Sequence, residues 1–222
     1  MDHSHLSAAE IHKDVPPDWY ETSVKINLLQ KYWHYRRVAE VGKFSQEQPG
    51  PILDIGSADG YFTRRLLNFT GAGEIIGIDV LKTSVNYAKH RYQAIKALKF
   101  QLGDAEKLAF ANNKFTSVYI LEALEHVHDA SKVLSEIYRV LKPGGYTIIL
   151  VPSENWLFKL GWPIWTHTRG RVWNDTHLNF FTGSKLPQLA KRIGFVNISV
   201  HTFILGMLLL VKARKPGPKT VK

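Results

Sequence analysis

The chain has 222 residues, of which 45% are apolar, 12% aromatic and 22% charged, and this composition excludes wholesale disorder, collagen-like repeats and a coiled coil. The length fits one large α/β domain better than two full domains. The absence of cysteine excludes disulfides, thiolate metal sites and a cysteine nucleophile, and five of the basic groups behind the net charge of +10 lie in the last eleven residues.

Residues 1–17 combine mixed charges with two prolines and show no sustained period, so we expect a poorly ordered N terminus. The histidines of this segment, His3, His5 and His12, lack the spacing that fixes a metal site, and we expect no metal. The first fifteen residues lack the pattern of a signal peptide, and the longest apolar stretch, residues 203–211, is far shorter than the ~20 residues that cross a bilayer. We therefore expect a cytoplasmic protein without a transmembrane segment.

A helix is predicted over residues 18–44. Apolar residues recur at helical spacing, with basic residues between them, at Val24, Leu28, Tyr32 and Tyr35. This pattern is typical of an amphipathic helix that covers a sheet. Because aromatic and basic side chains gather over residues 32–37, stacking on nucleic-acid bases or contact with a lipid interface stays open as an alternative.

After a break at residues 48–51, short apolar runs alternate with helical segments. The expected strands are Ile52–Ile55, Glu74–Val80, Leu98–Leu102, Val118–Leu121 and Tyr146–Val151. The expected helices between them are Tyr61–Phe69, Ser84–Ala97 and Ser131–Leu141. Strands that alternate with helices need crossover connections, so the sequence predicts a doubly wound α/β fold with a mostly parallel sheet and helices on both faces.

The last part of the chain predicts a helix at Ser184–Ile193 and two strands, Phe195–Thr202 and Gly206–Ala213. Residues 203–205 are too few for a parallel crossover, so we expect the last strand to run antiparallel. A single domain is thus expected over residues 18–213, followed by a basic tail at residues 214–222.

A glycine-containing turn follows the first strand. Residues 54–60 read Asp-Ile-Gly-Ser-Ala-Asp-Gly and lead directly into a helix, and such a turn brings backbone N–H groups close to a ligand. The second strand ends in Asp79, twenty-three residues after Gly56, where a carboxylate can accept hydrogen bonds from both hydroxyls of a ribose. Together these features indicate a cofactor that contains a ribose.

The acidic residues of this turn discriminate between cofactors. Asp54 and Asp59 would repel the pyrophosphate of a dinucleotide, and the turn lacks the full G-x-G-x-x-G pattern. Negative charge suits a ligand with an ammonium group and a sulfonium, as in S-adenosylmethionine.

These residues resemble the class I, Rossmann-like S-adenosylmethionine-dependent methyltransferases. The turn matches the family motif at Asp54, Gly56 and Gly60, whereas Ala58 replaces the usual middle glycine. Further similarity lies in the sequence Gly-Asp-Ala at residues 103–105, Leu-Glu-His-Val at 124–127 and Leu-Lys-Pro-Gly-Gly at 141–145. The likeness covers residues 52–152 and is greatest to the small-molecule branch that includes ubiquinone-pathway enzymes. A departure is Phe115-Thr116-Ser117, where the family often has Phe-Asp.

The resemblance implies roles for particular residues. Asp79 would bind the ribose, Asp104 the exocyclic amine of adenine, and Ala105 would supply a backbone N–H. The full set implied to contact S-adenosylmethionine is Asp54, Gly56, Ala58, Gly60, Asp79, Val80, Asp104, Ala105 and Leu121.

Methyl transfer needs alignment in a dry pocket, and a general base is optional. His126, in the loop after the fourth strand, is the candidate base, with a structural histidine as the alternative. Residues 153–183 are too long for a plain connection, so we expect them to cover the acceptor. Four of the six tryptophans lie between Trp156 and Trp173, which indicates a large aromatic or lipid-like acceptor, or else a cap with its aromatic side chains packed inward.

The favoured function is methyl transfer from S-adenosylmethionine to a small-molecule acceptor. The basic tail and the aromatic-basic helix leave RNA or protein as an alternative acceptor, although no RNA-binding module flanks the core. From other classes, a nicotinamide-dependent dehydrogenase shares the acid after the second strand, and a catalytically silent, cofactor-binding regulator would have the same motifs.

Overall fold

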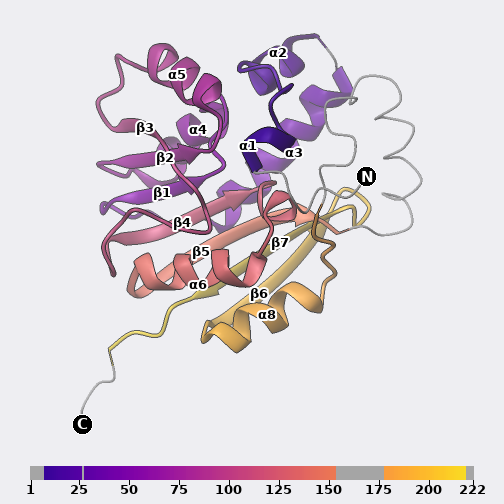
Figure 1. Ribbon diagram of the computed structural model, residues 1–222. Coiled ribbons are helices and arrows are strands. Elements are labelled where there is room, and N and C mark those ends of the chain that lie inside the picture. The colour runs from indigo at the N-terminus through magenta and orange to yellow at the C-terminus, as the bar shows by residue number, and fades with distance from the viewer. Residues whose placement is uncertain (1–7, 27, 154–177, 219–222) are drawn as a thin grey trace.

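The computed structural model describes residues 8–26, 28–153 and 178–218, and places them in a seven-stranded sheet flanked by helices (Figure 1). The strand order is β3-β2-β1-β4-β5-β7-β6. The strands are β1 (Ile52–Ile55), β2 (Ile75–Asp79), β3 (Leu98–Leu102), β4 (Phe115–Leu121), β5 (Leu141–Pro152), β6 (Val196–Phe203) and β7 (Leu208–Arg214). The helices are α1 (Ala8–Ile11), α2 (Trp19–Ile26), α3 (Leu28–Phe44), α4 (Tyr61–Thr70), α5 (Lys82–Arg91), the 3₁₀ turn η1 (Leu124–His126), α6 (Ala130–Val140) and α8 (Lys185–Ile193).

Strands β1 to β5 run parallel, and β7 lies antiparallel between β5 and β6. The doubly wound fold and the antiparallel last strand are therefore confirmed. The link between β6 and β7 turns at Ile204, Leu205 and Gly206, which all have positive φ. From β1 the chain adds β2 and β3 on one side of the sheet, and β4 and β5 are then added on the other side. The carboxyl ends of β1 and β4 therefore form the switch point where open α/β sheets bind ligands.

Each face of the sheet has its own buried cluster. Helices α6 and α8 cover one face, where Val133, Leu134, Ile137 and Val140 of α6 are all fully buried. This is the face that the spacing of apolar residues predicts. Helices α3, α4 and α5 cover the other face, and their cluster includes the buried rings of Tyr119 and Tyr146.

The N-terminal segment differs from its prediction in two ways. Residues 8–17, expected to be poorly ordered, form α1 and a turn, and the single helix expected over residues 18–44 is two helices, α2 and α3. The predicted buried face of α3 is also wrong, because Leu28, Tyr32 and Tyr35 are 85%, 55% and 68% exposed. The buried residues of α3 are instead His34, Arg37, Glu40 and Val41.

The C-terminal basic tail begins later than predicted. Arg214 ends β7, and its guanidinium donates to Gly144 O at 3.0 Å. Lys215 Nζ donates to Tyr138 O and Leu141 O, each at 2.8 Å, so this lysine holds the end of the chain against α6 and β5. Most of the insertion expected to cover the acceptor, residues 154–177, lies outside the described residues.

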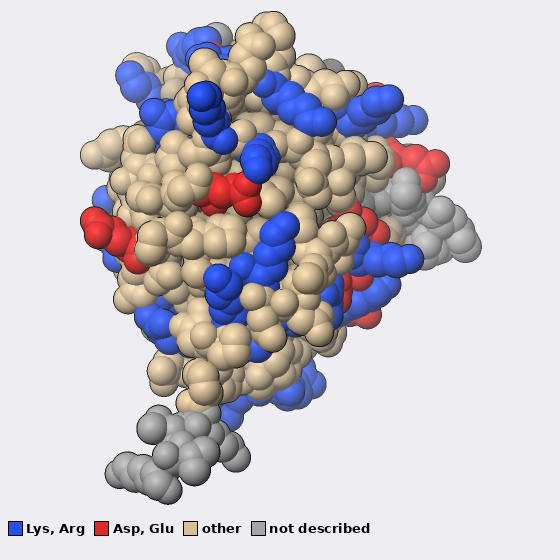
Figure 2. Space-filling view, turned by 90° about the vertical axis from the view of Figure 1, so that its left-hand side faces the viewer, with Lys and Arg blue, Asp and Glu red and all other residues tan. Residues whose placement is uncertain are grey.

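Within the described ranges, no helix has both the length and the apolarity needed to span a bilayer. On the face of the molecule drawn in Figure 2, Lys and Arg side chains are separated by uncharged residues and by a central acidic group, not gathered into one continuous stripe. A continuous basic stripe is the usual footprint of a nucleic-acid interface, and this face does not have one.

Candidate active site

The turn after β1 needs glycine at two positions because of its backbone conformation. Gly56 and Gly60 have φ of +73° and +78°, a region that favours glycine. A Cβ on Gly56 would lie 2.5 Å from the Cβ of Ala123, so a side chain here would push the turn away from the loop after β4. Ala58 also has positive φ, at 45°, where an alanine is less favourable than the glycine it replaces. The turn after β1 therefore packs closely against the loop after β4.

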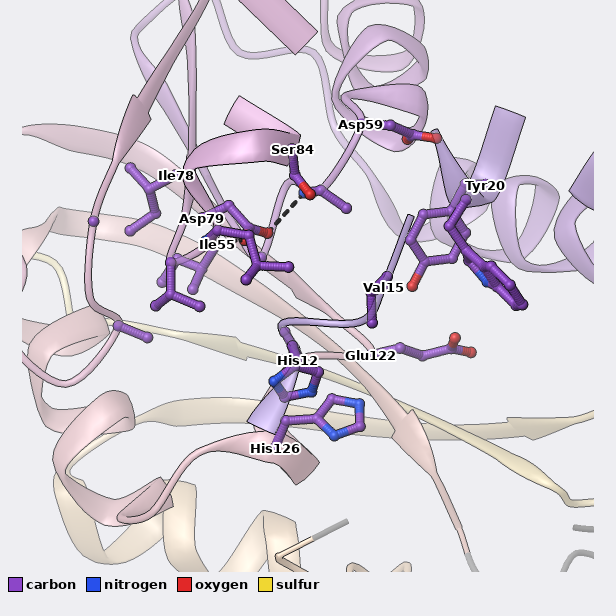
Figure 3. A pocket seen from close by; sticks show the side chains of 18 of the residues that line it. His12, Val15, Tyr20, Ile55, Asp59, Ile78, Asp79, Ser84, Glu122 and His126 are labelled. Carbon is purple, nitrogen blue, oxygen red and sulfur yellow. Dashed lines mark hydrogen bonds between the residues drawn. The ribbon is translucent and has the colours of Figure 1, made fainter. Parts of the chain in front are cut away.

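Asp79 fastens the turn to the end of β2. Its Oδ2 accepts a hydrogen bond from Ala58 N and its Oδ1 one from Leu81 N, both at 2.9 Å. Burial raises the pKa of the Asp79 carboxyl, while these N–H groups oppose that shift by stabilising the carboxylate. The side chain lines a cavity at the carboxyl ends of β1, β2 and β4 (Figure 3).

The other two acids of the turn have different roles. Asp54 is buried, accepts a hydrogen bond from Thr63 Oγ1 at 2.6 Å, and does not line the cavity. Burial raises the pKa of Asp54 to about 7. The hydrogen bond from Thr63 ties β1 to α4 beneath the turn. Asp59 does line the cavity, and its Oδ2 accepts from Glu21 N of α2 at 2.8 Å. Burial raises the pKa of Asp59 to about 6.

The structure brings only part of the predicted cofactor set together. The members that line the cavity are Gly56, Ala58, Asp79, Val80 and Ala105. The members that do not line it are Asp54, Gly60, Asp104 and Leu121. Asp104 is exposed, and its Oδ1 accepts from Glu106 N at 2.8 Å, so it shapes the turn that presents Gly103 and Ala105 to the cavity.

The candidate base His126 lines the cavity as well. Its ring packs edge-on against the ring of His12, with centroids 4.8 Å apart, and its Nε2 lies 4.0 Å from Glu125 Oε1 (Figure 3). The histidine that the sequence suggested as a base therefore does line the cavity.

Several lining residues were missed by the sequence reasoning. His12, Val15 and Tyr20 come from the N-terminal segment, which lies across the cavity opposite the strand ends (Figure 3). No local pattern marks them, because they reach the site through tertiary packing. Glu122 was also missed, although it directly follows β4 in a stretch that belongs to the family likeness.

Comparison with known proteins agrees with this geometry. A methyltransferase-domain profile matches residues 53–149. The demethylmenaquinone methyltransferase of Leptospira interrogans is 30% identical over 216 residues, covering 87% of this chain and 86% of the relative. The chain belongs to the class I S-adenosylmethionine-dependent methyltransferases.

Other members of the family extend the likeness. The ubiquinone/menaquinone biosynthesis C-methyltransferase UbiE of Desulfotalea psychrophila is 28% identical over 209 residues, covering 85% of this chain and 82% of the relative. The fold of phosphoethanolamine N-methyltransferase 2 from Haemonchus contortus, solved with S-adenosyl-L-methionine, superposes with a TM-score of 0.72 at 17% identity, covering 97% of this chain and 61% of that one. The chain is therefore an S-adenosylmethionine-dependent methyltransferase, and of the functions weighed from the sequence this is the one that stands.

Proposed function

We propose that this methyltransferase transfers a methyl group to a ring carbon of an aromatic, quinone-type small molecule in its reduced form. The observation that supports this acceptor is the 30% identity to a demethylmenaquinone methyltransferase across 86% of that relative's length. The cavity agrees with an apolar ligand, because its walls include Ile55, Ile78, Ile120 and Val127.

The residues present fit S-adenosylmethionine. Gly56, Gly103 and Ala105 line the cavity with no side chain larger than a methyl group, so the backbone can approach the cofactor closely. Asp79 presents a half-buried carboxylate that suits the two hydroxyls of the ribose, while Gly56 and Ala58 would lie along the amino-acid portion. When bound, S-adenosylmethionine supplies an activated methyl carbon on a positively charged sulfur.

The chain's own residues would then align the acceptor and manage one proton. Transfer to a ring carbon forms a carbon–carbon bond, breaks the sulfur–carbon bond and releases a proton from the acceptor. In this proposal His126 accepts the proton from a ring hydroxyl, which makes the ring carbon more nucleophilic. After the methyl group has been transferred, the hydrogen on that carbon leaves as a proton and the oxygen is protonated again, so that the ring is restored and one proton is released in total. The Glu125 carboxylate, 4.0 Å from His126 Nε2, favours the imidazolium that results. The apolar walls exclude water that would compete for the base.

The direct test supplies the purified chain with methyl-labelled S-adenosylmethionine and reduced demethylmenaquinone in detergent micelles. We expect label in the quinone, on carbon, as shown by mass spectrometry of the product. His126→Gln should lower turnover by about 10²- to 10⁴-fold and leave binding of S-adenosylmethionine unchanged. Label that enters only RNA or protein from a cell extract, with none in the quinone, would contradict the proposed acceptor.

A further inference from the structure

Glu122 stands in an unusual backbone position at the edge of the cavity. It directly follows β4, has a φ of +54°, and its N–H donates to Leu150 O at 2.7 Å. A residue with a β-carbon is costly in this left-handed region, at roughly 1–3 kcal/mol, and such strain gathers at functional sites. Because the strained residue also lines the cavity, its side chain is a candidate for ligand contact.

The carboxylate of Glu122 is only half satisfied by the protein. Its Oε2 lies 2.6 Å from Arg37 Nη2, and the side chain is 15% exposed. The other oxygen, Oε1, is buried and accepts no hydrogen bond of ordinary geometry within the described part of the chain, although the Trp33 side chain also stabilises the carboxylate. Buried polar atoms in native proteins are usually paired, so an unpaired one beside a cavity indicates that a ligand completes the set.

Arg37 is held by a chain of hydrogen bonds that reaches back to α2. Its Nη1 lies 3.0 Å from His34 Nδ1, and since a guanidinium can only donate, Nδ1 must accept. His34 therefore carries its proton on Nε2 and donates it to Ser23 Oγ at 3.1 Å, and Ser23 in turn donates to Tyr20 O at 3.0 Å. The Arg37 guanidinium also lies over the ring of Phe62, 4.7 Å from its centroid. These contacts fix the position of the arginine and, through it, the carboxylate of Glu122.

The direction of this ion pair matters for the cavity. Glu122 lines the cavity and Arg37 does not, so the pair presents its negative end to the ligand. Burial raises the pKa of Glu122, whereas Arg37 and the Trp33 side chain oppose that shift and favour the charged form. Glu122 and Asp79 lie on opposite sides of the cavity (Figure 3), so Glu122 is well placed for the end of the ligand away from the ribose.

We infer that Glu122 is a binding residue for the cationic end of S-adenosylmethionine, which carries a sulfonium and an ammonium group, and that Arg37 is its positioning residue. Asp54, which the sequence suggested for this electrostatic role, is hidden beneath the turn and pairs with Thr63. The inference rests on the methyltransferase activity and is independent of the proposed acceptor.

The test is calorimetric titration of wild type and Glu122→Gln with S-adenosylmethionine and with S-adenosylhomocysteine, which has the ammonium but no sulfonium. Glu122→Gln should weaken S-adenosylmethionine binding by about 10- to 100-fold. A smaller loss for S-adenosylhomocysteine assigns the contact to the sulfonium, and an equal loss assigns it to the ammonium. A change below about twofold for both ligands would overturn the inference.

Glu40→Gln is the matched control, because Glu40 is a buried acid of α3 that pairs with Arg36 and Lys43 and does not line the cavity. This control should bind both ligands as wild type does. If Glu40→Gln and Glu122→Gln weaken binding equally, the effect is a general loss of stability and the inference fails.

A second pair of variants covers the case in which Glu122→Gln does not fold around an unpaired Arg37. The double variant Arg37→Met with Glu122→Gln removes both charges and should still lose affinity for S-adenosylmethionine. Arg37→Met alone removes the cation that favours the charged form of Glu122, so its affinity should be weaker than that of wild type and should rise as the pH is raised. Wild-type affinity in the double variant, or no recovery with pH in Arg37→Met, would contradict the assignment.

Discussion

The two faces of the sheet bury different kinds of side chains. Under α6 and α8 the buried residues are mostly apolar, from Leu134 and Ile137 to the inward residues of β5 and β7, with Thr147 of β5 as a buried polar residue on this face. Under α3 the buried groups include His34 and Arg37, together with Tyr119 and Tyr146, whose hydroxyl oxygens lie 2.8 Å apart. The first face is specified by volume and burial, and the second by the pairing of donors with acceptors.

This difference explains where the site lies. On the polar side of the sheet, α2 brings Tyr20 to the cavity, His12 follows α1, and Arg37 of α3 pairs with Glu122, which follows β4. Buried ion pairs add little net stability compared with apolar residues of similar volume. The buried ion pair of the polar face therefore fixes the position of a charge beside the cofactor cavity and adds little to the stability of the fold.

The largest effect on stability should follow from opening the apolar face. Leu134→Ala removes a fully buried side chain between α6 and the sheet, and should lower the free energy of unfolding by about 2–5 kcal/mol. Ser135→Ala, at an exposed position next to it, should change that free energy by less than about 0.5 kcal/mol. Urea unfolding monitored by tryptophan fluorescence measures both. Equal effects of the two variants would show that packing does not specify this face.

The close contact between the turn after β1 and the loop after β4 can be tested at Gly56. Gly56→Ala should lower the free energy of unfolding by about 2–4 kcal/mol, because its Cβ would lie 2.5 Å from Ala123 Cβ in addition to the penalty of positive φ. Gly144→Ala has a similar φ of +80° but no atom within 4 Å of its Cβ, so it should lose only about 1 kcal/mol.

Ala123→Gly removes the clashing atom and should restore part of the loss when combined with Gly56→Ala. The same urea unfolding experiment, together with the affinity for S-adenosylmethionine, checks this rescue. If the double variant is no better than Gly56→Ala, the close approach of the turn to the loop after β4 is not what requires glycine.

The polar face should show a pH dependence that the apolar face lacks. Burial and the nearby Arg37 lower the pKa of His34 to about 2, from 6.5 in the unfolded chain. Below pH 6.5 the unfolded state binds a proton that the folded state does not, so stability falls as the pH falls. The contribution of His34 should be about 2 kcal/mol smaller at pH 5 than at pH 7.5.

His34→Gln keeps a donor and an acceptor but cannot be protonated, so its stability should fall less over this range. Asp54 and Asp59, whose pKa values are raised, act in the opposite direction in both proteins, and the difference between the two pH profiles isolates His34. Parallel profiles would show that His34 is protonated in the folded state.

The elements that local patterns predict are those whose buried residues are apolar. The spacing of Val133, Leu134 and Ile137 predicts both α6 and its inward face. The same reasoning fails for α3, where the apolar Leu28 and Tyr35 are exposed and three of the four buried side chains are charged or polar. The ion pair between Arg37 and Glu122 joins residues far apart in sequence, so no periodicity reveals it.

The site shows the same division. The turn at Gly56, the acid Asp79 and the histidine His126 all face the cavity, as the motif resemblance implies. Asp54 and Asp104 do not, because the first is needed to hold Thr63 and the second to close its own turn. Motif letters identify the loop, and the packing decides which of its side chains reach the ligand.

The most direct test of the site is a calorimetric titration of S-adenosylmethionine into wild type, Asp79→Ala and Asp104→Ala. The geometry predicts that Asp79→Ala weakens binding by about 100-fold, because the carboxylate that lines the cavity is lost, and that Asp104→Ala changes it by less than about threefold. A large loss in Asp104→Ala with little change in Asp79→Ala would contradict the placement of the cofactor in this cavity.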